Sequence, residues 1–262
     1  MTNTTLAVLL QHFFTERLCT QMQASPHTIA GYRDTFRLLL RFASAEVGRP
    51  PTKLRIEDLD VELISDFLSH IETARSNSAR SRNTRLAAIR SFFRYVAMTE
   101  PALMLHCQKI LTMPSKRYDR HTVEFLDRAE MEALLAAPDR STWAGRRDHA
   151  LLILALQTGL RASEIVNLVR GDLVTGTGAH VRCHGKGRKE RSTPLRRETV
   201  KVLEAWLEER RGGASDPLFP TIRGGKLSRD ALERIVQRHI TASAKTCPSL
   251  VGKRVSPACA SA

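Results

Sequence analysis

Two basic residues in the second half of the chain have surroundings that could hold a phosphate group. Arg161 follows an apolar segment that ends at Gly159, so buried neighbours on both sides could aim its guanidinium. Lys186 lies between two glycines, which allow the backbone and the ammonium group to approach a phosphate closely. Each residue also has an ordinary interpretation, because Arg161 could cap the preceding helix and Lys186 could be a solvated turn lysine.

The segment from Thr73 to Thr99 is strongly basic, because it contains arginines and no acidic residue. Arginine forks bind phosphate oxygens, so the segment favours a surface for a nucleic-acid backbone. An exposed arginine-rich helix without a partner is the alternative. The residues expected to bind DNA in this segment, in the helix after Ser25 and beside Lys186 are Thr28, Arg33, Arg82, Arg85, Arg90, Arg94 and Arg188.

The composition of the 262 residues agrees with a polyanionic partner. The formal net charge is +14, from 41 Lys and Arg against 27 Asp and Glu, and the basic residues are spread along the chain. Nucleic acid is the leading candidate, and a basic protein kept soluble by its net charge is the alternative. Five cysteines without a CxxC pair favour reduced thiols and a cytoplasmic protein. No segment has the length and apolarity of a membrane span.

Hydrophobic periodicity predicts the helices that must position the basic residues of the first half. Apolar residues recur at helical spacing in 5–22, after the N-cap residue Ser25, after Asp60 and through 81–98. Short connections between these segments indicate a small all-α bundle.

The second half of the chain mixes helices with strands. Residues 176–195 alternate as a strand, turn at Gly-Lys-Gly and continue as a second strand, which predicts a β-hairpin. The expected fold class is mainly α with a small β-hairpin or sheet. We expect a helical DNA-binding domain at 1–104, a linker at 105–124 and a second domain at 125–262.

Three residues near the hairpin are of types that bind metal ions. His180, Cys183 and His184 lie close in sequence, but strand alternation puts Cys183 on the face opposite the two histidines. No fourth ligand is near in the sequence, so a zinc site is not expected. The chain also lacks a Walker loop, and no nucleotide cofactor is expected.

Several of these segments resemble one known family. The sequences "TGLRASEIVNL" and "HGKGRKERSTPL" are similar to the arginine box and lysine hairpin of the tyrosine recombinase, or phage integrase, family. Its N-terminal core-binding domain resembles "SPHTIAGYRDTFRLLLRF" and "NTRLAAIRSFFRYV". The stretch "LFPTIRGGKLSRDAL" resembles the family's segment between the lysine hairpin and the next active-site box.

The resemblance implies a SAM-like helical core-binding bundle followed by an incomplete α+β DNA breaking-rejoining catalytic domain. It implies DNA integration and strand exchange through a phosphotyrosyl intermediate, without metal or nucleotide cofactor, on double-stranded DNA and with possible self-association there. Carried over by position, Arg161 is the first phosphate-binding arginine and Lys186 is the general acid that protonates the leaving oxygen. Preorganised donors of this kind stabilise charge that develops on the transferring phosphate.

The resemblance also leads us to expect a recombinase truncated within its catalytic domain. The family's next box, Pro-His-x-Leu-Arg-His, has Ala258 and Ser261 here in place of its first histidine and its arginine. The tyrosines of the chain, Tyr32, Tyr95 and Tyr118, all precede Arg161 and none matches the family's nucleophile. The alternatives are therefore a catalytically defective recombinase and a non-catalytic DNA-binding remnant that occupies recombination sites. An unrelated helical transcription factor would explain the charge but not the pairing of Arg161 with Lys186.

A frameshift is a hypothesis for the final residues. If one base is removed at the first position of the Ala258 codon, the genetic code permits the shifted frame to read His, Val, Leu, Arg and His. Those are the residues expected after Ser256 and Pro257. The nucleotide sequence decides the matter, because the hypothesis requires a shifted frame that continues to a tyrosine.

Overall fold

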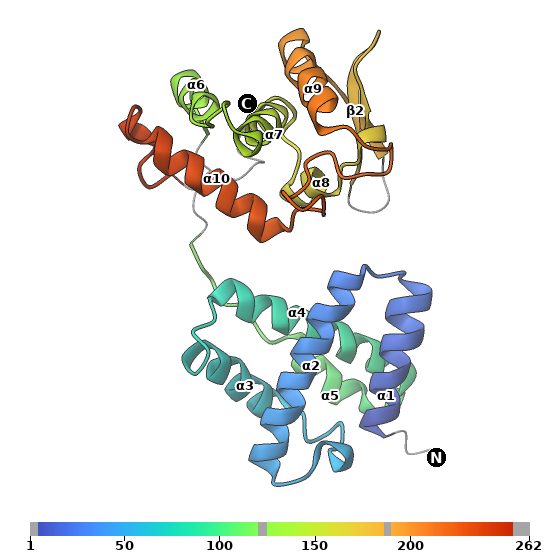
Figure 1. Ribbon diagram of the computed structural model, residues 1–262. Coiled ribbons are helices and arrows are strands. Elements are labelled where there is room, and N and C mark those ends of the chain that lie inside the picture. The colour runs from blue at the N-terminus through green and yellow to red at the C-terminus, as the bar shows by residue number, and fades with distance from the viewer. Residues whose placement is uncertain (1–4, 120–124, 186–189, 254–262) are drawn as a thin grey trace. The chain divides into compact units, whose positions relative to one another are not determined.

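The computed structural model describes residues 5–119, 125–185 and 190–253 (Figure 1). The chain divides into two compact units, Met1–Arg120 and His121–Ala262, and each is described by itself. The fold class expected from the sequence is confirmed, because the described residues form many helices and one small antiparallel sheet. None of the described helices is long and apolar enough to cross a membrane.

The first unit is helical throughout its regular structure. Side chains of Thr5, Ser25, Asp60 and Ser78 accept backbone N–H groups at the starts of its main helices, which satisfies donors that a helix leaves free. The helices are α1 (Leu6–His12), its π-helical continuation (Phe13–Gln21), α2 (Pro26–Val47), α3 (Val61–Thr73), α4 (Ala79–Thr99) and α5 (Met104–Leu111), with 3-10 turns at Pro51–Lys53 and Pro101–Leu103.

An aromatic cluster centres the core of the first unit. Phe13 is fully buried and meets Phe92 edge-to-face, with ring centroids 5.4 Å apart. Phe36 contacts the same Phe92 ring at 5.1 Å, so α2, α4 and the segment after α1 share one packing site. The remaining core is aliphatic, and it holds α4 at the centre of the bundle, where α2, α3 and α5 all pack against it.

Part of the predicted linker is a helix. Residues 105–111 belong to α5, in which Cys107 and Ile110 are fully buried in the core of the first unit. The helix is short and places only these two side chains in the core, so its apolar period is too brief to stand out from sequence. Residues 114–119 follow without regular secondary structure.

The second unit combines helices with one small sheet. The elements of this unit are α6 (Arg128–Ala136), α7 (Trp143–Thr158), α8 (Ala162–Asn167), a 3-10 turn (Arg170–Asp172), β1 (Leu173–Val174), β2 (His180–His184), β3 (Glu190–Pro194), α9 (Arg197–Arg210), α10 (Arg229–Ser243) and a 3-10 turn (Pro248–Leu250). The strands form an antiparallel sheet in the order β1-β2-β3, with Cys183 opposite Arg191 in the β2–β3 hairpin. The predicted hairpin is therefore present, with one short strand added at its edge.

Helix α7 is buried along most of its length, as its apolar sequence predicts. It ends at Gly159, which adopts the left-handed conformation (φ 59°) and donates its N–H to the carbonyl of Ala155. Asp148, fully buried on α7, accepts hydrogen bonds from Arg147, Arg238 and His239. This carboxylate therefore joins α10 to α7, the helix that directly precedes Arg161.

Candidate nucleic-acid interface and phosphate-binding site

Arg161 is the N-cap residue of α8 and its side chain projects into solvent. Its backbone N–H donates to Oε2 of Glu164 at 2.8 Å, and its Nη1 donates to Oε1 of the same carboxylate at 3.3 Å. The Arg161 side chain is 65% exposed, whereas that of Glu164 is 4% exposed. Within the described part of the chain, Arg161 makes no hydrogen bond to α7, so helix capping does not account for its position.

A second arginine shares the buried carboxylate. Nη2 of Arg191 donates to Oε2 of Glu164 at 3.0 Å, and Nε of Arg191 lies 3.1 Å from the sulfur of Cys183. The contact with Cys183, together with the charge of Glu164, raises the pKa of Arg191 above its usual range. Two guanidinium groups around one buried carboxylate leave a net positive charge that faces solvent. This arrangement can bind a phosphate oxygen without rearranging the arginines.

Lys186 and Arg188 lie outside the described residues, as do Ala258 and Ser261. The structure describes the strand ends that flank the lysine hairpin, where His184 pairs with Glu190.

Three of the residues expected to bind DNA lie on the surface of the first unit. Thr28, Arg33 and Arg94 are exposed. The Thr28 hydroxyl lies 2.9 Å from that of Ser25, at the start of α2. Arg33 and Arg94 have no ion pair with any described carboxylate, so both cations are available to a phosphate backbone.

The other three arginines of α4 that were expected to bind DNA are engaged within the protein. Nη1 of Arg85 donates to Asp34 on α2 at 2.9 Å, and Nε of Arg82 lies 3.7 Å from Glu72 on α3. Arg90 donates from Nη1 to the hydroxyl of Ser115 at 3.4 Å, and its buried Nε has no partner among the described residues. The absence of acidic residues along α4 therefore does not leave Arg82 and Arg85 unpaired, because α3 and α2 supply the carboxylates.

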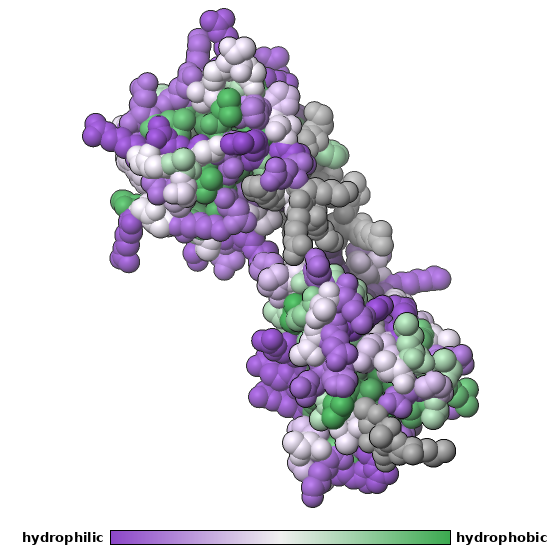
Figure 2. Space-filling view, turned by 90° about the vertical axis from the view of Figure 1, so that its right-hand side faces the viewer, coloured by the Kyte–Doolittle hydropathy of each residue, from purple (hydrophilic) through white to green (hydrophobic). Residues whose placement is uncertain are grey.

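Asp34 is held between two arginines. Partial burial acts to raise the pKa of this carboxyl, but hydrogen bonds from Arg37 and Arg85, and their charges, outweigh burial and lower the pKa below its usual value. Asp34 therefore remains ionised and neutralises part of the basic surface of α4. Figure 2 shows that hydrophilic residues predominate on the face in view, with apolar residues in small patches.

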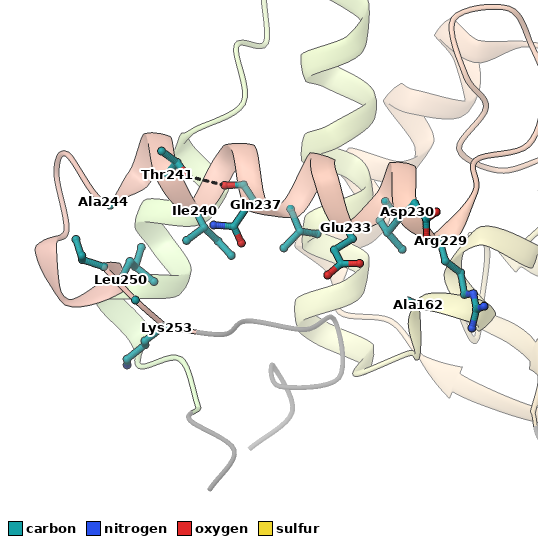
Figure 3. A pocket seen from close by; sticks show the side chains of 14 residues that line it. Ala162, Arg229, Asp230, Glu233, Gln237, Ile240, Thr241, Ala244, Leu250 and Lys253 are labelled. Carbon is teal, nitrogen blue, oxygen red and sulfur yellow. Dashed lines mark hydrogen bonds between the residues drawn. The ribbon is translucent and has the colours of Figure 1, made fainter. Parts of the chain in front are cut away.

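A groove of about 920 Å³ runs along α10 in the second unit. Figure 3 shows Ile240 and Leu250 in the groove and Lys253 at one end of it, with Arg229 and Ala162 at the other. Residues 250–253 form one wall of the groove. Buried Glu130 holds this segment in place, because it accepts hydrogen bonds from Ser249 at 2.6 Å and from Lys253 at 2.8 Å. Hydrogen bonds from Lys253 and Ser249 lower the pKa of Glu130 to about 2.

No group of three or more His, Cys, Asp or Glu side chains is placed to hold a metal ion within the described ranges. Cys183 is buried, and the ring of His180 bonds to the carbonyl of Gly178.

Sequence comparison identifies the family. The profile described as "Phage integrase family" matches residues 124–254, and the profile "Phage integrase, N-terminal SAM-like domain" matches residues 12–100. The chain belongs to the phage integrase family. The resemblance drawn from the arginine box and the lysine hairpin is thus confirmed at the level of the family.

Curated relatives of this integrase-family chain align over most of it. A putative integrase/recombinase, y4rC, of Sinorhizobium fredii (strain NBRC 101917 / NGR234) is 53% identical over 250 residues, covering 95% of this chain and 75% of the relative. Tyrosine recombinase XerC of Pelobacter propionicus (strain DSM 2379 / NBRC 103807 / OttBd1) is 35% identical over 228 residues, covering 87% of this chain and 72% of the relative.

Solved structures share the fold. The XerH site-specific recombinase bound to its palindromic difH substrate superimposes with a TM-score of 0.66 at 21% identity, covering 94% of this chain and 70% of that one. The Tn1549 transposon integrase in complex with transposon right end DNA gives a TM-score of 0.69 at 14% identity, covering 96% of this chain and 83% of that one.

Two residues of this candidate site, Glu164 and Arg191, were not singled out from the sequence. Glu164 stands three positions after Arg161, which is the spacing of an acidic residue that reaches back to a helix N-terminus. Arg191 faces Cys183 across the predicted hairpin, so its place near the site follows once the register is known. The position of Glu164 could therefore be predicted from the sequence, whereas that of Arg191 required knowledge of the strand pairing.

Proposed function

We propose that the protein binds duplex DNA as a member of a site-specific tyrosine recombination system, with Arg161 and Lys186 directed at the reacting phosphate. The observation that carries the proposal is the exposed guanidinium of Arg161, backed by the buried Glu164 within the segment that matches the integrase profile. A guanidinium held in this way offers fixed donors where phosphate charge develops. Lys186, from the hairpin between β2 and β3, would protonate the leaving 5′ oxygen.

The chemistry that this proposal implies is an exchange of one phosphodiester for another. A tyrosine oxygen attacks the backbone phosphate, a 3′-phosphotyrosyl bond forms, and the bond to the 5′ oxygen breaks as that oxygen accepts a proton. The bond energy is kept in the covalent intermediate, so rejoining needs no nucleotide cofactor. Arg161 and Lys186 act on phosphate oxygens in this scheme and would tighten binding of DNA without changing sequence preference.

A second candidate is a DNA-binding protein that occupies recombination sites without cleaving them. The observation that favours it is the placement of the tyrosines of the chain in the first unit. Tyr32 and Tyr95 pack against the buried Phe13, and Tyr118 lies seven positions after the last residue of α5, Leu111. None of these tyrosines follows Arg161, and Ala258 and Ser261 stand where the family's box has a histidine and an arginine.

Self-association on DNA is part of the proposal. One solved relative is a lambda integrase dimer bound to a COC′ core site, and another is a lambda integrase tetramer bound to a Holliday junction. We expect this chain to bind paired half-sites with more than one copy per duplex, which analytical ultracentrifugation of the complex measures.

The experiment that separates the two candidates is a nicked suicide duplex incubated with the full chain and resolved by denaturing electrophoresis. The second candidate predicts bound DNA under native conditions and no covalent adduct after denaturation, because losing the nucleophile removes the covalent route. A covalent protein–DNA adduct would contradict it and establish cleavage. Failure of the chain to bind duplex DNA at all would reject both candidates.

A further inference from the structure

The segment that follows α5 is fastened onto α4. The side-chain amide of Asn83 pairs with the backbone of Lys116 twice, since Nδ2 donates to its carbonyl at 2.7 Å and Oδ1 accepts its N–H at 2.9 Å. Ser115, one residue earlier, accepts the hydrogen bond from Arg90 of α4. Residues 115 and 116 therefore have fixed positions against the arginine-rich helix, and Lys116 extends its basic surface.

Glu72 of α3 brings two cations of this surface together. Its carboxylate accepts from Nζ of Lys116 at 2.9 and 3.1 Å, and its Oε2 lies 3.7 Å from Nε of Arg82. The side chains of Lys116, Glu72 and Arg82 are 54%, 19% and 13% exposed, so the cluster opens to solvent on the lysine side. Neither Lys116 nor Glu72 was a candidate from the sequence, because the three residues come from separate segments.

A carboxylate between a lysine and an arginine occupies a position that suits a phosphate. Both anions offer charged oxygens to the same N–H donors, and arginine binds either one through the same fork. Ion pairs that reach solvent are weak, since water screens the attraction and the long side chains lose freedom. Exchange of the carboxylate for a backbone phosphate is therefore cheap at this cluster.

We propose that Glu72 stands in for a DNA phosphate at a binding position formed by Lys116 and Arg82. The inference rests on the proposed binding of duplex DNA. It adds Lys116, which lies outside α2 and α4, as a phosphate contact, and Glu72 as a carboxylate that competes with the phosphate. Without DNA, Glu72 neutralises the two cations and keeps Lys116 next to α4. With DNA, a backbone phosphate takes the cations, and Glu72 opposes binding through its negative charge.

Glu72 could instead assist DNA binding by positioning Lys116, and the two roles predict opposite changes in affinity when its charge is removed. If Glu72 only positions Lys116 for DNA, removal of its charge releases the lysine and weakens binding. If Glu72 competes with phosphate, removal of its charge strengthens binding, and Lys116 then contributes more than before. The sign of the change in affinity distinguishes the two roles.

The test measures affinity of the full chain for a fluorescein-labelled duplex by anisotropy over a series of salt concentrations. Glu72→Gln is compared with Asp66→Asn, which removes the same charge from an exposed side chain of α3 that has no hydrogen bond or ion pair to any described residue. We expect Glu72→Gln to tighten binding about two- to fivefold beyond the control, the size of an ion pair whose lysine faces solvent. Lys116→Ala should weaken binding and reduce the salt slope by about one.

A double-mutant cycle completes the test. We expect Lys116→Ala to cost more affinity when it is combined with Glu72→Gln than in the parent, because the lysine then no longer has a competing carboxylate. Thermal unfolding of each variant checks that the first unit is intact. If the parent binds duplex DNA but Glu72→Gln binds no tighter than Asp66→Asn, the inference is wrong and the proposed function stands. If the parent does not bind duplex DNA, both are wrong.

Discussion

The two units carry arginine–carboxylate clusters that are built in opposite ways. In the first unit, Arg82 and Arg85 are the better buried partners, and at the Asp34 pair the carboxylate is the more exposed group. In the second unit, Glu164 is buried while Arg161 and Arg191 are exposed. Asp34, which is 40% exposed, can be exchanged for a phosphate, whereas the buried Glu164 holds Arg161 and Arg191 toward solvent. The first arrangement suits reversible DNA binding, and the second suits a fixed phosphate-binding position.

The largest loss of stability is expected when the charge of a fully buried carboxylate, Asp148, is removed. Asp148 is fully buried, its partner Arg147 is nearly so, and Arg238 and His239 bond to the same group. Asp148→Asn should destabilise the second unit by about 3–5 kcal/mol, because it leaves a buried arginine without its counter-charge.

Urea unfolding followed by tryptophan fluorescence measures this loss. Trp143 and Trp206 are the only tryptophans of the chain, and both belong to the second unit, with ring centroids 5.3 Å apart. Glu132→Gln is the matched control, because Glu132 is exposed and, among the described residues, pairs only with the exposed Arg128. A loss no larger than that of the control would contradict the structural role of Asp148.

A smaller loss is expected at Glu164, since its arginines face water. Glu164→Gln removes the charge that holds Arg161 and Arg191 and weakens the bond to the backbone N–H of Arg161. We expect about 1–3 kcal/mol of destabilisation, the cost of weakening hydrogen bonds to a buried charged group. The same fluorescence assay measures it. A loss equal to that of Asp148→Asn would remove the distinction between exposed and buried partners.

A pH-dependent effect is expected at Glu130. Its pKa is lowered to about 2 from an ordinary value of 4.5, mainly by hydrogen bonds from Lys253 and Ser249. A lowered folded-state pKa means that ionised Glu130 stabilises the fold above about pH 4.5 and that this contribution disappears as the pH falls toward 2. The difference in unfolding free energy between the parent and Glu130→Gln should therefore be constant near neutral pH and shrink in acid. A difference that grows in acid would contradict this assignment.

The smallest effect is expected at Asp34. Asp34→Asn frees Arg85 and Arg37 from their carboxylate, and should tighten duplex binding about twofold, as expected for an exposed pair. Anisotropy titration measures the change against Asp66→Asn. Weaker binding by Asp34→Asn would mean that Asp34 positions Arg85 for DNA and does not compete with it.

Local features of the fold, such as the ends of helices, could be predicted from the sequence. Ser25 caps α2 through its side chain, and Gly159 ends α7 in the left-handed conformation, because both choices depend on a few neighbouring residues. The Gly-Lys-Gly turn similarly located the hairpin, although Lys186 itself lies outside the described residues. Arg161 was placed at the start of a helix for the same local reason.

The partners of the charged residues could not be predicted from the sequence. Arg85 pairs with Asp34 and Lys116 pairs with Glu72, and each pair joins segments that are brought together only by helix packing. The arginines of α4, with no acidic residue among them, indicated free cations, but charge along one helix does not reveal the charge on its neighbours.

The central claim is that the basic surface of the first unit binds the DNA backbone, and one salt-dependent titration tests it most directly. Arg94→Glu is compared with Arg128→Glu, an equal change of charge at a position of α6 that is 91% exposed. We predict that Arg94→Glu weakens binding to duplexes of different sequence alike and lowers the slope of log affinity against log salt by about 0.9, the loss of one phosphate contact, while Arg128→Glu leaves the slope unchanged. Equal affinities and equal slopes for the two variants would contradict the claim.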